Sequence, residues 1–119
     1  MRDHTELRAF ELADALALRV YELTNGFPRH ELFGLTGQMR RAAVSAASNI
    51  VEGCARNTET DYLRFLDMSY GSAREIEYHV SLAYRLGYLS SEAHDALRGL
   101  AVETSKVLNG LIRSLRHEQ

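Results

Sequence analysis

Residues 35–56, which read LTGQMRRAAVSAASNIVEGCAR, limit the possible folds of this chain more than any other stretch. At about 100° per residue, they form three lines along a single helix. The first apolar line is Leu35, Met39, Ala43, Ala46, Ile50 and Cys54, the second is Val44, Ala47 and Val51, and the polar line beside them is Gln38, Arg41, Ser45, Asn49, Glu52 and Arg56. One apolar line is enough to dock a helix on a core. Two lines of mostly small side chains therefore predict a helix that is contacted on more than one side.

Three further stretches repeat apolar residues at helical spacing, and none alternates as a strand would. With the central helix, the predicted helices cover residues 7–24, 36–55, 59–87 and 91–116. The connections between them are mostly short, and helices joined in this way lie antiparallel to their neighbours. The sequence therefore predicts an all-α protein, an antiparallel up-and-down four-helix bundle formed by residues 1–119 as a single domain.

Local signals place the helix ends. Thr36 is expected to cap the central helix, and Thr58 to cap the third helix through its side-chain oxygen. Gly87 predicts a glycine cap at the end of the third helix. Phe27 and Phe33 are expected to cover the end of the bundle, because they lie in the connection between the first two helices.

The composition is that of an ordinary globular protein, with 45% hydrophobic and 25% charged residues. The formal net charge of −2 does not favour a generic polyanion binder, since such domains usually carry a basic excess. The one cysteine cannot form an intramolecular disulfide. The charged N-terminal residues do not resemble a signal peptide, and no apolar run is long enough to span a bilayer. We therefore expect a cytoplasmic protein without a membrane partner.

The enzyme most often built on a four-helix bundle is a carboxylate di-iron protein, which needs Glu-x-x-His on two of its helices. Here Glu75 and Glu77 precede His79 by four and two residues, so the required spacing is missing. His79 lies on an apolar line, where a hydrogen-bonded core histidine is the better interpretation. Cys54 lies on an apolar line near a helix C-terminus, which predicts a buried and inert thiol. Phosphate-binding loops, nucleophile elbows and zinc ligand sets do not occur in the sequence. We therefore expect no catalytic residue, no cofactor and no metal.

The polar line on the central helix is the strongest candidate for a site. Arg41 and Glu52 are too far apart to pair within the helix, and Glu75 or Glu77 on the third helix is a possible partner for Arg41. Such pairs fix the register between helices or between subunits. The predicted polar network or subunit interface is Gln38, Arg41, Ser45, Asn49, Glu52, Glu75 and Glu77.

A competing interpretation concerns the arginines. Arg40, Arg41 and Arg56 could form a phosphate-binding surface for nucleic acid. The central helix lacks the interleaved aromatic residues that stack on bases, which weakens this alternative.

The pattern FPxxExFGLxxQxRRAAxSxxxNIxEGxxR at residues 27–56 resembles the signature of a known family. Its members are four-helix bundle proteins first noted as reading frames inside intervening sequences of 23S ribosomal RNA genes. The likeness continues in Phe65-Leu66, in Gly71-Ser72-x-x-Glu75-x-Glu77 and in Leu86-Gly87-Tyr88-Leu89, while Phe10-Glu11 stands where the family often has Trp-Gln.

The resemblance implies a ring-shaped homopentamer of uncertain function. A related branch, the accessory variability protein of diversity-generating retroelements, binds a reverse transcriptase and nucleic acid through a basic surface, whereas this chain is slightly acidic. The sequence therefore predicts a non-enzymatic, homo-oligomeric interaction or scaffold protein whose main partner is itself. The alternative is a nucleic-acid or ribonucleoprotein accessory protein that displays arginines on an oligomeric ring.

Overall fold

The computed structural model of this protein describes residues 2–118, and within that range it contains helices and no strand. The four long helices are α1 (Arg8–Thr24), α2 (Leu35–Cys54), α3 (Glu59–Arg85) and α4 (Ser91–Glu118), and two short 3₁₀ turns are η1 (His4–Glu6) and η2 (Arg29–Glu31). The predicted all-α class and four-helix architecture are confirmed. The helix bounds differ from the predicted ranges by one or two residues at most of the ends, where helices commonly fray.

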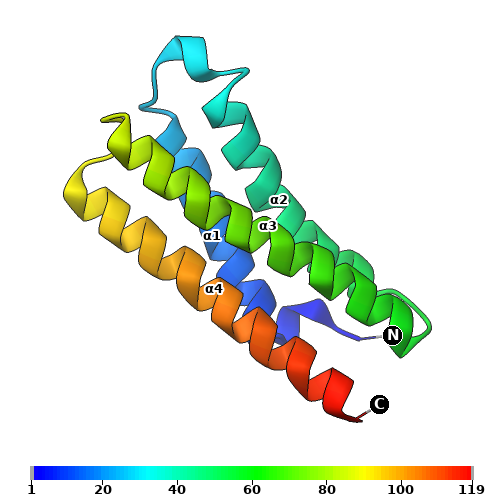
Figure 1. The fold of residues 1–119 in the computed structure, drawn as a ribbon. Coiled ribbons are helices and arrows are strands. Elements are labelled where there is room, and N and C mark those ends of the chain that lie inside the picture. Colours follow the sequence, from blue (N-terminus) through cyan, green and yellow to red (C-terminus); the bar gives the residue numbers. More distant parts are fainter. Residues whose placement is uncertain (1, 119) are drawn as a thin grey trace.

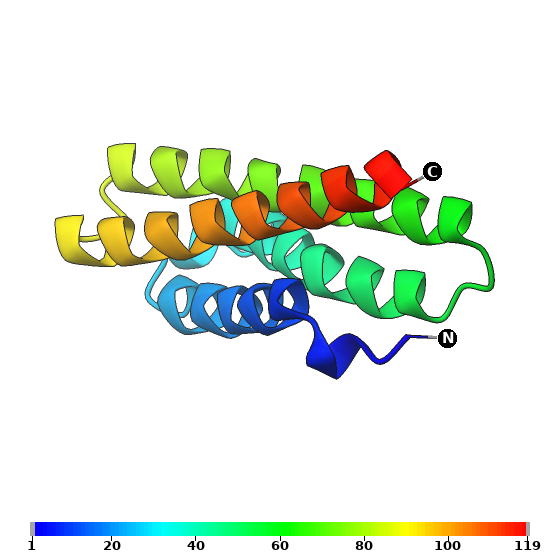
Figure 2. The ribbon, with the colours of Figure 1, turned by 90° about the horizontal axis from the view of Figure 1, so that it is seen from below.

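The four helices run side by side in an elongated bundle of 45 × 23 × 19 Å (Figure 1). Neighbouring helices pack as α1 with α2, α2 with α3, α3 with α4 and α4 with α1, which closes the bundle. Figures 1 and 2 show that the α1–α2 and α3–α4 connections lie at one end, while the α2–α3 connection and both chain ends lie at the other. The chain therefore runs up and down as expected for short connections. Within residues 2–118, no helix combines the length and the apolar character that crossing a bilayer demands.

The core lies along the bundle axis, where each helix buries its apolar line. Leu16, Ile50, Leu66 and Leu97, one from each long helix, are completely buried and belong to one continuous cluster. The backbones of α2 and α3 approach each other closely where small residues lie between them. A Cβ atom added at Gly53 would lie only 3.0 Å from the Cβ atom of Phe65. This close contact makes α2 and α3 the most extensively packed pair.

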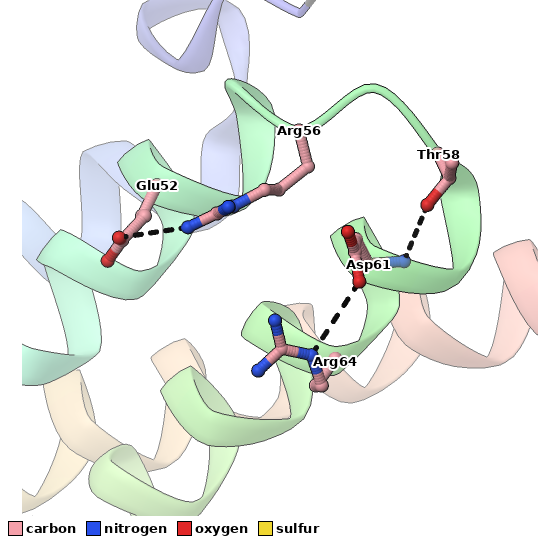
Figure 3. Close-up of polar contacts among 5 residues, drawn as sticks. All are labelled: Glu52, Arg56, Thr58, Asp61 and Arg64. Atoms are coloured by element: carbon pink, nitrogen blue, oxygen red, sulfur yellow. Dashed lines mark hydrogen bonds and ion pairs between the residues drawn. The ribbon is translucent and has the colours of Figure 1, made fainter.

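The ends of α3 follow the local sequence signals. The Thr58 side chain accepts a hydrogen bond of 3.2 Å from the Asp61 N–H group, as Figure 3 shows. At the other end, Gly87 has a φ of +82°, and the Tyr88 N–H group donates to the Ala83 carbonyl oxygen at 2.9 Å. These contacts form the Schellman motif that ends many helices.

Two expectations for the α1–α2 connection and the start of α2 are wrong. Thr36 does not cap α2, because the helix begins at Leu35 and the Glu31 carboxylate accepts the Leu35 N–H group at 3.1 Å. Phe33 is 93% exposed, whereas Phe27 is buried as expected. The reason lies in tertiary contacts made by the turn between α3 and α4. Tyr88 from that turn packs its ring on Phe27 and donates its hydroxyl group to Glu31 at 2.7 Å, so the bundle end is filled without Phe33.

Candidate functional site

The predicted polar line of α2 forms one wall of a groove against α3. We call this groove the α2–α3 polar groove, and its volume is about 300 Å³. Its lining residues are Gln38, Arg41, Ala42, Ser45, Ser72 and Glu75. Three residues of the predicted network therefore come from α2 and one, Glu75, comes from α3. The structure brings these four together because the polar line of α2 lies at the edge of its buried face.

Hydrogen bonds between side chains connect the two helices at the floor of the groove. The Ser72 hydroxyl group donates to the Ser45 hydroxyl oxygen at 2.9 Å. The Asn49 side-chain amide donates to the same oxygen and to the Ser45 carbonyl oxygen, both at 2.9 Å. Asn49 thus belongs to the network although it does not line the groove. These bonds fix the rotation of α2 against α3, and no base accepts a proton from either serine in the described part of the chain.

Arg41 and Glu75 face the same groove without bonding to each other. Both side chains are exposed, and within residues 2–118 Arg41 forms no ion pair. Glu75 is instead 3.2 Å from Nε2 of His79, one turn further along α3. The predicted pairing of Arg41 with Glu75 or Glu77 is therefore absent from the described single chain. Both charged groups remain available to a molecule that enters the groove.

His79 lies behind this groove in the core, as its position on an apolar line predicted. The side chain is only 3% exposed, and its Nδ1 atom has no hydrogen-bond partner among residues 2–118. Burial lowers the pKa of His79, because the charged ring loses its hydration, while the nearby Glu75 carboxylate opposes that effect. The histidine is thus held near its neutral form.

Glu77 does not belong to the α2–α3 polar groove, and the sequence-based expectation for it is corrected. Its carboxylate accepts a hydrogen bond of 2.6 Å from the Ser105 hydroxyl group of α4. The same carboxylate lies 3.3 Å from Nε of Arg74. Glu75 and Glu77 point about 200° apart on a helix, so only one of them can face α2. Glu77 therefore stabilises the contact between α3 and α4.

Two of the three arginines proposed for phosphate binding are engaged within the chain. Arg40 donates from Nε to the Thr24 hydroxyl oxygen at 2.9 Å and lies over the Tyr21 ring. Arg56 binds Glu52 at 3.1 Å, as Figure 3 shows. Arg56 is thus a local partner for Glu52, one that the sequence pattern did not assign. Arg41 differs from both, because its guanidinium group makes neither a hydrogen bond nor an ion pair to another residue in the described range.

Two further reactive side chains, Cys54 and Tyr62, lie in the core. Cys54 is buried, and burial raises the pKa of its thiol group, which keeps it protonated and weakly nucleophilic. Burial likewise raises the pKa of the neighbouring Tyr62 to about 12. Within residues 2–118, no three His, Cys, Asp or Glu side chains lie close enough together to hold a metal ion.

The sequence analysis missed Ser72 as a member of the groove. The signal was a small hydroxyl residue on an otherwise apolar line, three positions before Glu75. Residues at that spacing share one face of a helix. The Ser72 hydroxyl group bonds to Ser45 of α2, a contact between helices that the spacing within α3 alone does not predict.

Comparisons with known proteins agree with this architecture. The family model of the 23S rRNA-intervening sequence protein matches residues 5–110. One similar solved structure is that of a protein of unknown function from the S23 ribosomal protein family of Bacteroides thetaiotaomicron, with a TM-score of 0.81 and 23% sequence identity. The match covers 88% of this chain and 95% of that chain, and at this identity it supports the fold alone. A comparison with functionally curated proteins gives no match. Since the family model covers most of the sequence, the chain belongs to the family of 23S rRNA-intervening sequence proteins.

Proposed function

We propose that this protein is a non-enzymatic, homo-oligomeric scaffold or interaction protein that acts in the cytoplasm. The observation that carries the proposal is the second apolar line of α2, which the single chain leaves partly uncovered. Val44 is 44% exposed, and Val51, two turns further along, is also exposed. An apolar line that the fold itself does not bury favours a protein–protein contact.

Exposed apolar residues of α1 extend this surface. Arg40 lies over the Tyr21 ring, which places Tyr21 at the junction of α1 with α2. Val44 follows Arg40 by one helical turn, and Leu18 precedes Tyr21 by three residues, so both lie along the same junction. Leu18 is 63% exposed. We call Leu18, Tyr21, Val44 and Val51 the α1–α2 apolar face, and we propose that it packs against a second copy of the chain.

We further propose a closed ring of five subunits, which is the assembly that the family resemblance implies. A ring needs two different surfaces on each subunit, because each copy contacts its neighbours head to tail. Phe33 at the end of the bundle offers a second apolar contact outside the α1–α2 apolar face. Arg41 and Glu75 supply exposed charges of opposite sign, which would set the register between subunits.

The experiment is light scattering on a sizing column, with wild type compared with Val44→Glu and Leu18→Glu. We expect wild type to have about five times the 13.4 kDa mass of the chain. Each variant should dissociate while remaining folded, because a charge buried at the contact loses its hydration. Ala96→Glu, at an exposed position of α4, is the matched control and should keep the wild-type mass. A monomeric wild type would refute the proposal.

The alternative, a nucleic-acid accessory protein, rests on Arg41, since its guanidinium group is exposed and forms no ion pair within residues 2–118. A ring would repeat this charge once per subunit and raise a weak affinity. The ratio of absorbance at 260 and 280 nm across the same column peak distinguishes the two functions. The alternative is favoured if nucleic acid elutes with the wild-type oligomer at low salt and leaves it at high salt. The Arg41→Gln variant should then elute without nucleic acid.

A further inference from the structure

A small cavity lies where α1 is connected to α2, at the end of the bundle opposite the chain termini. Its volume is about 260 Å³. The lining residues are Thr24, Asn25, Phe27, Pro28, Arg29, Leu32, Thr36 and Arg40. This cavity is separate from the α2–α3 polar groove and shares no lining residue with it.

The guanidinium group of Arg40 is fixed in position at this cavity. Its Nε atom donates to Thr24, and its Nη2 atom donates to the Asn25 side-chain oxygen at 3.2 Å. The carbon of the group lies 4.8 Å from the centre of the Tyr21 ring. Its third nitrogen, Nη1, makes no hydrogen bond within residues 2–118. Neutral oxygens and an aromatic ring therefore orient a positive charge that no carboxylate neutralises.

The lining of the cavity carries a local positive charge in a protein that is slightly acidic overall. Arg29 is the second cation, and it forms no ion pair with a described residue. No Asp or Glu contributes to the lining. Two arginines without a counter-ion in one concave site attract an oxyanion, and guanidinium groups bind phosphate oxygens through paired N–H donors.

Thr36 adds a hydroxyl group to the lining of the cavity. Thr36 is 3% exposed and lines the cavity, yet its hydroxyl group makes no hydrogen bond to another residue in the described range. A ligand oxygen within reach of this hydroxyl group would provide it with a hydrogen-bond partner.

Together, these features define the class of ligand. We propose that the cavity binds a small organic phosphate monoester, whose phosphate group lies between Arg29, Arg40 and the Thr36 hydroxyl group. The apolar part of the lining consists of Phe27, Pro28 and Leu32, which suits an apolar or planar group attached to the phosphate. The volume lies just below the usual range of about 300–1,000 Å³ for ligand pockets, which suits a small ligand.

Titration calorimetry with phenyl phosphate and with inorganic phosphate tests the site on the full-length protein. Phenyl phosphate should bind more tightly than inorganic phosphate, because its ring contacts the apolar part of the lining. Arg40→Gln should weaken phenyl phosphate binding at least tenfold, and Thr36→Val several-fold. Arg29→Gln, at an exposed position, should weaken binding about fivefold without changing the melting temperature.

The matched control is Arg113→Gln, which removes an exposed arginine of α4 outside the cavity and should leave the affinity unchanged. Because Arg40 also contacts Thr24 and Asn25, a melting curve of Arg40→Gln must accompany the titration. If that variant unfolds, Arg29→Gln and Thr36→Val still decide the question. Absence of binding by wild type at millimolar phenyl phosphate would overturn the proposal, as would equal affinities of wild type, Arg29→Gln and Thr36→Val.

Discussion

The Ser69 hydroxyl group of α3 donates a hydrogen bond of 2.6 Å to the main-chain carbonyl oxygen of Ala46 in α2. Both residues are completely buried. A side chain as short as serine reaches the backbone of the neighbouring helix only when the two helices are very close. The small residues of α2 therefore determine the spacing between α2 and α3. The α2–α3 polar groove lies between the same two helices.

Replacing Ala46 with leucine should overpack this contact. We expect Ala46→Leu to lower the free energy of unfolding by about 1–3 kcal/mol, because added methylene groups force neighbouring side chains out of their rotamers. Urea denaturation measures the change. Ala96→Leu introduces the same side chain at an exposed position of α4 and should have almost no effect. Equal stabilities of the two variants would show that α2 and α3 are not closely packed at Ala46.

Replacement by alanine should lower the stability of the protein at Gly53 and raise it at Gly71. At Gly53 the new methyl group would meet Phe65 Cβ at 3.0 Å and Tyr62 Cδ1 at 3.2 Å, so we expect a loss of about 1 kcal/mol or more. At Gly71 no atom lies within 4 Å, and alanine should stabilise α3 by about 1 kcal/mol through its higher helix propensity. Thermal unfolding of both variants checks the signs, and a stabilised Gly53→Ala would contradict the close contact.

Helical periodicity was sufficient to predict the fold, because each long helix places apolar residues such as Leu16 or Ile50 on one side. The polar line of α2 likewise predicted the groove, since Gln38, Arg41 and Ser45 share one edge of the helix. Periodicity within one helix, however, does not determine which neighbour a residue faces. Glu77 faces α4 for that reason, although the sequence allowed it to face α2.

The end of the bundle could not be predicted, because its contacts join residues far apart in the chain. Glu31 caps α2 and also accepts the Tyr88 hydroxyl group, which lies 57 positions away. Neither contact leaves a periodic signal in the sequence. The same contacts determine that Phe33 is exposed while Thr36 is buried beside the cavity.

The hydrogen bond from Tyr88 in the α3–α4 turn to Glu31 in the α1–α2 connection should stabilise the protein in a pH-dependent way. The Tyr88 hydroxyl group and the Leu35 N–H group lower the pKa of Glu31 in the folded protein below its usual 4.5. The unfolded chain therefore binds a proton first, and this stabilisation is present above pH 4.5 and lost as the pH falls through the folded pKa. Tyr88→Phe should melt at a lower temperature than wild type at pH 7, and the difference should shrink at lower pH. Tyr78→Phe, at an exposed position, is the control and should melt like wild type at both pH values.

Protonation of His79 should destabilise the folded protein. Burial lowers its pKa below the ordinary 6.5, so as the pH falls through 6.5 the unfolded chain takes up a proton before the folded chain does. The free energy of unfolding should therefore fall between pH 7.5 and pH 5.5, and by less in His79→Leu, which removes both the titrating ring and its unpaired Nδ1 atom. Urea denaturation at the two pH values measures this difference, and His30→Gln, at an exposed position, should behave like wild type. If the free energy of unfolding fell equally in wild type and in His79→Leu, other groups would cause the pH dependence.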